Sequence, residues 1–165
     1  MPSFDISSEV NMQSIDDAIN QTIKEIINRF DFKGIKVEII LDQKEKTIKI
    51  SSTEAYKLEA IQEAFNKRLV KRGVSVLALE YGPEEKASGS GARIVAKVAA
   101  GIEKEKAKEI VGIIKAEGKK VQAQIHDDKV KVMGKSRDDL QDCIALIKSK
   151  EGKIGIPLQF GNFRE

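Results

Sequence analysis

Several residue types are scarce in this chain, and each scarcity excludes a class of protein. The sequence has no tryptophan, one cysteine and one histidine. A single cysteine cannot form an intramolecular disulfide, so a disulfide-stapled fold is excluded. A lone histidine leaves a zinc site or a Ser/Cys-His nucleophilic pair without its usual partners. We expect Cys143 to be a buried thiol on a helix and His126 to be exposed in a turn.

Long hydrophobic runs are also missing. No apolar stretch approaches the roughly 20 residues that a membrane-spanning helix needs. The first nine residues do not show a basic segment followed by an apolar run, which a secretory leader would have. These features lead us to expect a soluble cytoplasmic protein.

Charge is nearly balanced, with a net value of +3, but it is unevenly spread along the sequence. Residues 1–82 carry 12 Lys and Arg against 13 Asp and Glu, and the remainder carries 17 against 13. This surplus favours an anionic partner for the second half, although a solvated Lys/Glu surface is the alternative.

What the sequence does contain is a repeat of apolar positions. Residues 48–58 align with residues 130–140, so that Ile48 meets Val130 and Leu58 meets Leu140. Further along, Phe65 meets Ile147. The repeated unit spans about half of the chain, which is too long for a solenoid repeat. Two related small domains are expected.

Periodicity predicts the same series of elements in each half. Alternating apolar residues predict strands, and apolar residues three or four apart predict helices, the first beginning at a capping box of Ser14 and Asp17. In the first half we expect a strand at 4–6, a helix from 14 to about 30, a hairpin at 35–41 and 47–50, a helix at 54–71 and a strand within 74–81. In the second half we expect a strand at 94–98, helices at 103–116 and 136–149, a hairpin at 121–125 and 129–133, and a strand at 158–160.

The order β-α-β-β-α-β is that of a ferredoxin-like domain, in which two helices cover one face of an antiparallel four-stranded sheet. We therefore predict an α+β protein with two tandem ferredoxin-like domains, at residues 1–82 and 93–165. Residues 83–92 have the composition of a flexible linker. The alternative that the first strand pairs with the sheet of the other domain stays open.

No motif in the sequence indicates catalysis. Gly134-Lys135-Ser136 looks like the end of a phosphate-binding loop. The complete motif requires a glycine at the position that Lys129 occupies in this chain, and the residues between Lys129 and Gly134 form a predicted strand. Ser136 with Asp139 is instead typical of a helix cap, beside which Lys135 and Arg137 could still bind phosphate. The carboxylates show no acid/base spacing. We predict a protein that is not an enzyme and has no cofactor.

The strongest candidate surface is the sheet face that points away from the helices. Strand alternation turns five polar side chains to that face, namely Arg93, Lys97, Gln122, Gln124 and Lys131. The cations suit phosphate and the amides suit base edges, so this face is predicted to bind a nucleotide or single-stranded nucleic acid. The alternative is a charged face that stays hydrated or packs against the other domain.

Several segments together resemble one known family. These are MPSFDI at 1–6, RFDFK at 29–33, KRG at 71–73, VQAQI at 121–125, GKSRDDLQ at 134–141 and QFGNFRE at 159–165. Over its whole length the chain is similar to the YajQ family of bacterial nucleotide-binding proteins. The resemblance implies two ferredoxin-like domains and binding of nucleotides or nucleic acid. In some members it implies a cyclic di-GMP effector that acts with a transcription regulator.

Three functional hypotheses follow. The first is nucleotide binding (cyclic di-GMP, GTP or ATP) through Arg93, Lys97, Gln122, Gln124, Lys131, Lys135, Ser136 and Arg137. The second is RNA binding by the basic sheet face. The third is a protein-interaction adaptor with Phe160, Phe163 and Arg164 as anchors, unless these aromatic rings pack beneath the last strand.

Overall fold

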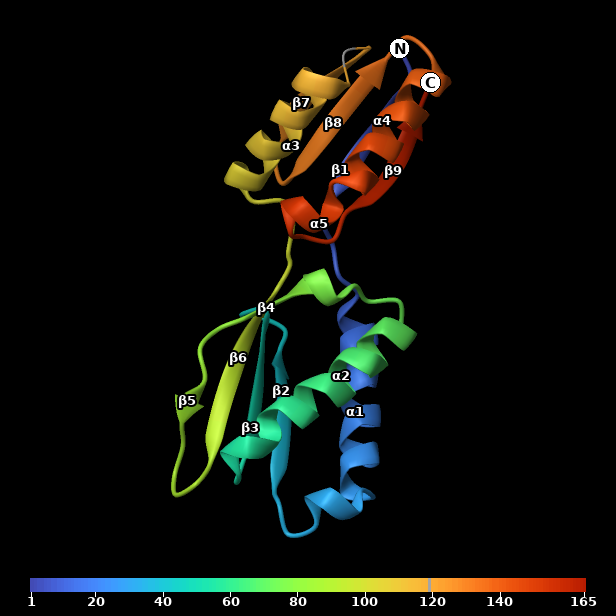
Figure 1. The fold of residues 1–165 in the computed structure, drawn as a ribbon. Coiled ribbons are helices and arrows are strands. Elements are labelled where there is room, and N and C mark those ends of the chain that lie inside the picture. The colour runs from blue at the N-terminus through green and yellow to red at the C-terminus, as the bar shows by residue number, and fades with distance from the viewer. Residues whose placement is uncertain (119) are drawn as a thin grey trace. The chain divides into compact units, whose positions relative to one another are not determined.

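The computed structural model describes residues 1–118 and 120–165, and it contains two α+β units, each with its own antiparallel sheet (Figure 1). Unit 1 consists of residues 1–9 and 99–165, and unit 2 consists of residues 10–98. The chain therefore enters unit 2 after Glu9 and returns to unit 1 at Ala99.

Unit 1 has the sheet order β7-β8-β1-β9, with helices on one face. Its elements are β1 (Ser3–Ser7), α3 (Lys104–Glu117), β7 (Val121–His126), β8 (Lys129–Gly134), α4 (Arg137–Ser149), the short α5 (Glu151–Ile154) and β9 (Gln159–Arg164). The inner face of β1 supplies Phe4 and Ile6, which are fully buried among residues of α3, β8 and α4.

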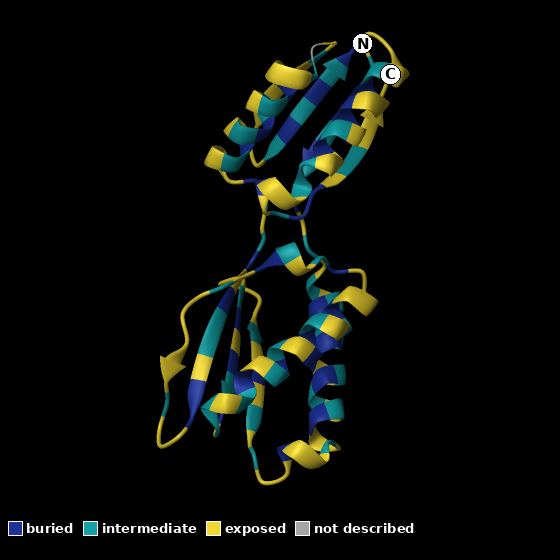
Figure 2. Cartoon of the chain, in the orientation of Figure 1, coloured by how far each residue is buried: buried dark blue, intermediate teal, exposed yellow. Residues whose placement is uncertain are grey.

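Unit 2 has the sheet order β2-β3-β6-β4, and α1 and α2 lie together on one face of it. Its elements are α1 (Met12–Ile27), η1 (Phe30–Phe32), β2 (Val37–Asp42), β3 (Thr47–Ser52), η2 (Ala55–Lys57), α2 (Leu58–Lys71), η3 (Val76–Ala78), β4 (Leu79–Tyr81), β5 (Glu85–Lys86) and β6 (Ala92–Val98). Buried residues alternate with intermediate or exposed ones along β3 and β8, and Figure 2 shows this alternation clearly for β8.

Two ferredoxin-like sheets are thus confirmed, and so is the pairing of the first strand with the other sheet. β1 pairs with β8 and β9, although α1 follows it in the chain. β6 takes the matching central position between β3 and β4. Each sheet therefore contains one central strand that we had assigned to the other domain. This strand is β1 in the sheet of unit 1 and β6 in the sheet of unit 2.

The observed division differs from the consecutive halves 1–82 and 93–165. Residues 83–92 do not join two domains, because β5 pairs with β6 and both remain inside unit 2. The composition of this segment is that of a turn, and a hairpin turn uses the same glycine and serine residues as a linker.

The repeat predicted the packing correctly. Ile48, Ile50 and Phe65 are fully buried in unit 2, and their counterparts Val130, Val132 and Ile147 are fully buried in unit 1. The start of the first helix was predicted wrongly, since α1 begins at Met12. The side chain of Asn11 accepts hydrogen bonds from the backbone N–H groups of Gln13 and Ser14 and so caps this helix.

Candidate functional site

The five side chains that we expected on one sheet face lie on two sheets. Arg93 and Lys97 belong to β6 in unit 2, while Gln122, Gln124 and Lys131 belong to β7 and β8 in unit 1. The prediction of a single basic face is therefore wrong, because strand β6 pairs with β3 and not with β8. Arg93 is also neutralised in part by Glu85, whose Oε2 lies 2.9 Å from its Nε.

The open face of the unit 1 sheet carries a polar pocket of about 300 Å³. It is lined by Asp5, Gln124, His126, Lys131, Asn162 and Arg164. The register explains this grouping, since Asp5 on the central strand β1 is opposite Lys131 on one side and Gly161 on the other. Lys131 is in turn opposite Gln124. We call these six residues the β1 pocket.

An irregularity in β9 brings two of these residues to the open face. The pairing of β1 with β9 shifts in register between Ser3 and Asp5, and Asn162 adopts a left-handed backbone conformation (φ 53°). The Asn162 amide then donates a hydrogen bond of 2.6 Å to Oδ2 of Asp5. This bond orients the carboxylate of Asp5, which lines the pocket.

The charges of the pocket are unequal. Lys131 and Arg164 provide two cations against the single carboxylate of Asp5, and neither cation has an ion-pair partner among the described residues. Such a group can hold an anion while Asp5, Gln124 and Asn162 supply neighbouring acceptors and donors.

A second hollow, of about 420 Å³, lies at the N-terminus of α4 and shares Arg164 with the β1 pocket. Arg137 lines this hollow and forms an ion pair with Glu165. The hydroxyl of Ser136 accepts a hydrogen bond from the backbone N–H of Asp139 at 3.2 Å, so the helix cap that we predicted there is confirmed. Lys135 is exposed beside the cap.

The sequence interpretation did not place Asp5 or Asn162 in a candidate site, named Arg164 only as an anchor for a protein partner, and treated His126 only as part of a turn. His126 is indeed exposed and ends β7, but it also lines the β1 pocket. The available signal was the resemblance itself, because residues 1–6 and 159–165 were among its matching segments. Only the pairing of β1 with β8 and β9 places these two ends of the chain beside Lys131.

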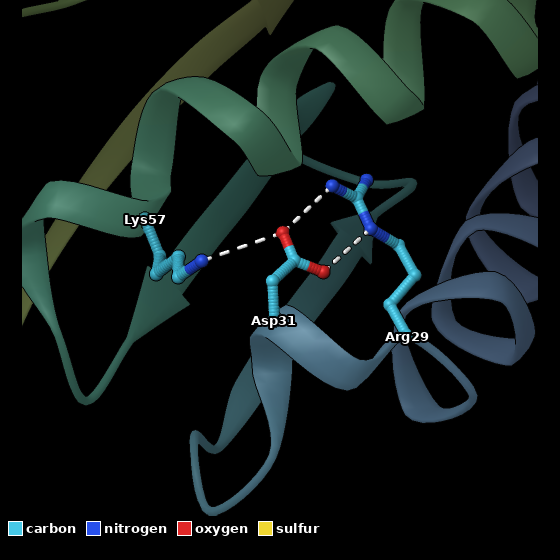
Figure 3. Close-up of polar contacts among 3 residues, drawn as sticks. All are labelled: Arg29, Asp31 and Lys57. Atoms are coloured by element: carbon cyan, nitrogen blue, oxygen red, sulfur yellow. Dashed lines mark hydrogen bonds and ion pairs between the residues drawn. The ribbon is translucent and has the colours of Figure 1, made fainter.

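Unit 2 holds a different polar cluster, at the end of the sheet where α1 leads into β2. Arg29 donates two hydrogen bonds to Asp31, of 3.0 and 2.8 Å, and Nζ of Lys57 lies 3.4 Å from Oδ2 of Asp31 (Figure 3). The hydrogen bonds from Arg29 lower the pKa of Asp31, and Lys57 adds to this effect. The same hydrogen bonds raise the pKa of Arg29. Asp31 thus joins two segments that are 26 residues apart.

Other titratable groups belong to the cores. Burial raises the pKa of the Cys143 thiol to about 11 and that of Tyr81 to about 12. Cys143 is therefore a neutral thiol near pH 7, and its expected burial on a helix is confirmed. Within residues 1–118 and 120–165, no three His, Cys, Asp or Glu side chains are placed to hold a metal ion. In the same residues no helix is long and apolar enough to cross a bilayer.

The fold and the pocket define a class of protein with two ferredoxin-like units and an anion-compatible face on the sheet of one unit. Residues 2–164 match the family described as nucleotide-binding protein YajQ-like, and the chain belongs to this family. It is 52% identical to a nucleotide-binding protein of Trichlorobacter lovleyi over the full length of both chains. It is also 50% identical to one of Geotalea uraniireducens, again over both full lengths. A third relative, from Carboxydothermus hydrogenoformans, is 49% identical over 98% of this chain and 97% of its own.

Proposed function

We propose that the protein is a non-enzymatic nucleotide-binding protein and that the β1 pocket holds the nucleotide. The observation that carries this proposal is the convergence of Lys131 and Arg164 on one pocket with Asp5, Gln124 and Asn162. The names of the relatives support the same ligand class.

The pocket chemistry favours a guanine nucleotide. Lys131 and Arg164 would hold phosphate, since charged hydrogen bonds to phosphate are among the stronger ones in proteins. The oriented carboxylate of Asp5 would accept hydrogen bonds from the ring N–H and amino groups of guanine, and the amides of Gln124 and Asn162 would donate to its carbonyl oxygen. Adenine lacks the first of these donors at the matching ring nitrogen.

The two hollows that share Arg164 support a cyclic dinucleotide in particular. A pocket of about 300 Å³ is at the small end of the range for ligand sites and fits one nucleotide-sized group. The neighbouring hollow of about 420 Å³ contains Arg137, which would exchange its ion pair with Glu165 for a second phosphate. We infer that cyclic di-GMP would bridge both, with Arg164 between them, and that the bound form acts as a cytoplasmic effector on a transcription regulator.

Binding would be tested by calorimetric titration with cyclic di-GMP, GTP and a short single-stranded RNA at near-physiological salt. We expect saturable binding of the cyclic dinucleotide. Lys131→Ala and Arg164→Ala should each weaken it by roughly 10- to 100-fold, since a hydrogen bond to a charged group contributes about 1.5–3 kcal/mol. Lys97→Ala, which changes an exposed lysine of the other sheet, is the matched control.

A second pair of substitutions tests the α4 hollow separately. Lys135→Ala combined with Arg137→Ala should weaken the cyclic dinucleotide but affect GTP less. Equal affinity of wild type, Lys131→Ala and Arg164→Ala would remove the β1 pocket as the site. No heat with any nucleotide would contradict the proposed function itself.

A further inference from the structure

We propose that the open face of the unit 2 sheet binds the same face of a second copy of the chain, so that the protein forms a symmetric dimer. This face is made by the side chains of three neighbouring strands, β2, β3 and β6, which pair in a regular register. It shares no residue with the β1 pocket or with the hollow at the N-terminus of α4, so the dimer does not depend on nucleotide binding.

The register arranges the outward side chains of these strands in three rows. α1 and α2 lie on one face of the sheet (Figure 1), and Ile39, Ile50 and Ala96 belong to the core on that side. The residues that alternate with these core positions therefore point to the open face. The rows across β2, β3 and β6 are Glu38-Ser51-Arg93, Ile40-Lys49-Val95 and Asp42-Thr47-Lys97.

The charges on this face are sorted by strand. The acidic Glu38 and Asp42 are on β2 at the edge of the sheet, and the basic Arg93 and Lys97 are on β6, two strands away. All four are exposed. Among residues 1–118 and 120–165, Glu38, Asp42 and Lys97 form no ion pair. Arg93 binds Glu85 through Nε, and a guanidinium has further N–H donors for a second carboxylate.

A two-fold axis along β3 makes two such faces complementary. Rotation about this axis brings the open faces together and keeps every residue at its own height along the strands. β2 of one copy then lies over β6 of the other, as in the aligned packing of two sheets. The facing pairs, each formed twice, are Glu38 with Arg93, Ile40 with Val95, and Asp42 with Lys97.

Other two-fold arrangements of the same face bring like charges together. An axis perpendicular to the strands places β2 over β2, so that carboxylates face carboxylates. An axis between β3 and β6 places β2 over β4, where Asp42 meets the outward Glu80 of the second copy. Because like charges in an interface are costly, the axis along β3 is favoured over both.

The middle row supplies the apolar centre of this interface. Ile40 is 48% exposed in the single chain, and Val95 of the second copy would cover it. Lys49 lies on the axis, with Glu38 and Asp42 of both copies on the neighbouring strands. An apolar centre inside a rim of charged contacts is the usual composition of a protein interface.

Analytical ultracentrifugation of the full chain tests the dimer. The wild type should change from monomer to dimer across the micromolar range, and added salt should weaken the dimer because its rim is charged. Glu38→Arg and Arg93→Glu should each weaken it by about 10- to 100-fold, since each reversal creates two like-charge contacts. An equimolar mixture of these two variants should form a heterodimer of wild-type affinity, because both contacts then regain opposite charges.

Two controls accompany this mixture. Glu38→Arg mixed with Lys97→Glu should not regain affinity, because these positions lie in different rows. Lys71→Glu reverses an exposed charge on α2 and should leave the dimer unchanged.

Three results would overturn the proposal. A wild type that stays monomeric throughout the micromolar range would show a face that remains hydrated or contacts another part of its own chain. Dimerisation of Glu38→Arg with wild-type affinity would place the interface elsewhere. Failure of the mixture of Glu38→Arg and Arg93→Glu to associate would show that these residues do not face each other. Both residues are exposed, so each variant should keep the melting temperature of the wild type.

Discussion

At the scale of single residues, backbone conformation decides the role of two glycines that look alike in the sequence. Gly101 lies just after the return to unit 1 with φ +83°, and a Cβ there would lie 2.5 Å from Oδ2 of Asp128. Gly112 lies within α3 and is exposed, and a Cβ added to it would have no other atom within 4 Å. The first needs the freedom of glycine, whereas the second only weakens its helix.

Substitution by alanine should therefore have opposite effects at these two sites. Gly101→Ala should lower the free energy of unfolding by about 1–3 kcal/mol, since a side chain at positive φ is strained and also contacts Asp128. Gly112→Ala should raise it by about 0.5–1 kcal/mol through helix propensity. Urea denaturation measures both, and a stabilised Gly101→Ala would contradict the assigned conformation.

At the scale of elements, helix termini were predicted partly correctly. The Ser136 cap of α4 was predicted from the spacing to Asp139 and is present, but Ser14 does not cap α1. Ser14 and Ser136 both fit the sequence pattern of a helix-capping residue. At α1, however, Asn11 lies three residues before Ser14, and its side-chain oxygen is equally suited to capping. Local sequence therefore indicates that a helix begins here but does not choose between two capping residues.

Ser136→Ala tests whether this hydroxyl serves the helix or a ligand. Its oxygen already accepts from the N–H of Asp139, so we expect a loss of about 1 kcal/mol in stability. Nucleotide affinity should stay within about twofold of the wild type, because Ser136 lines neither the β1 pocket nor the hollow at the N-terminus of α4. A clear fall in affinity at unchanged stability, measured by calorimetry and urea denaturation, would instead make Ser136 a ligand contact.

At the scale of the whole molecule, the division into units changes the distribution of charge. The consecutive halves have net charges of −1 and +4, which suggested an anionic partner for the second half. Unit 2 instead carries 15 Lys and Arg against 13 Asp and Glu, which leaves 14 against 13 for unit 1. The net charges are +2 and +1, so the candidate sites depend on local groups of cations and not on a basic half.

The same division predicts which fragments fold. Residues 10–98 contain a complete sheet and core, and we expect them to unfold cooperatively on their own. Residues 99–165 lack β1, whose Phe4 and Ile6 fill the unit 1 core between β8 and β9, and should remain unfolded. Adding a peptide of residues 1–9 should restore their structure, as circular dichroism would show. Cooperative unfolding of residues 99–165 alone would contradict this account.

The sequence by itself determined the number and type of the main elements, the matching buried positions of the two copies, the burial of Cys143 and the family resemblance. These depend on the period of apolar residues, which is a local property of a strand or helix. Only the tertiary structure decided that β1 and β6 each complete the sheet of the other expected domain. Both strands present an equivalent apolar face, so local pattern cannot select their partners. Because β6 pairs with β3, Arg93 and Lys97 lie on a different sheet from Lys131. Because β1 pairs with β8 and β9, Asp5, Asn162 and Arg164 line the same pocket as Lys131.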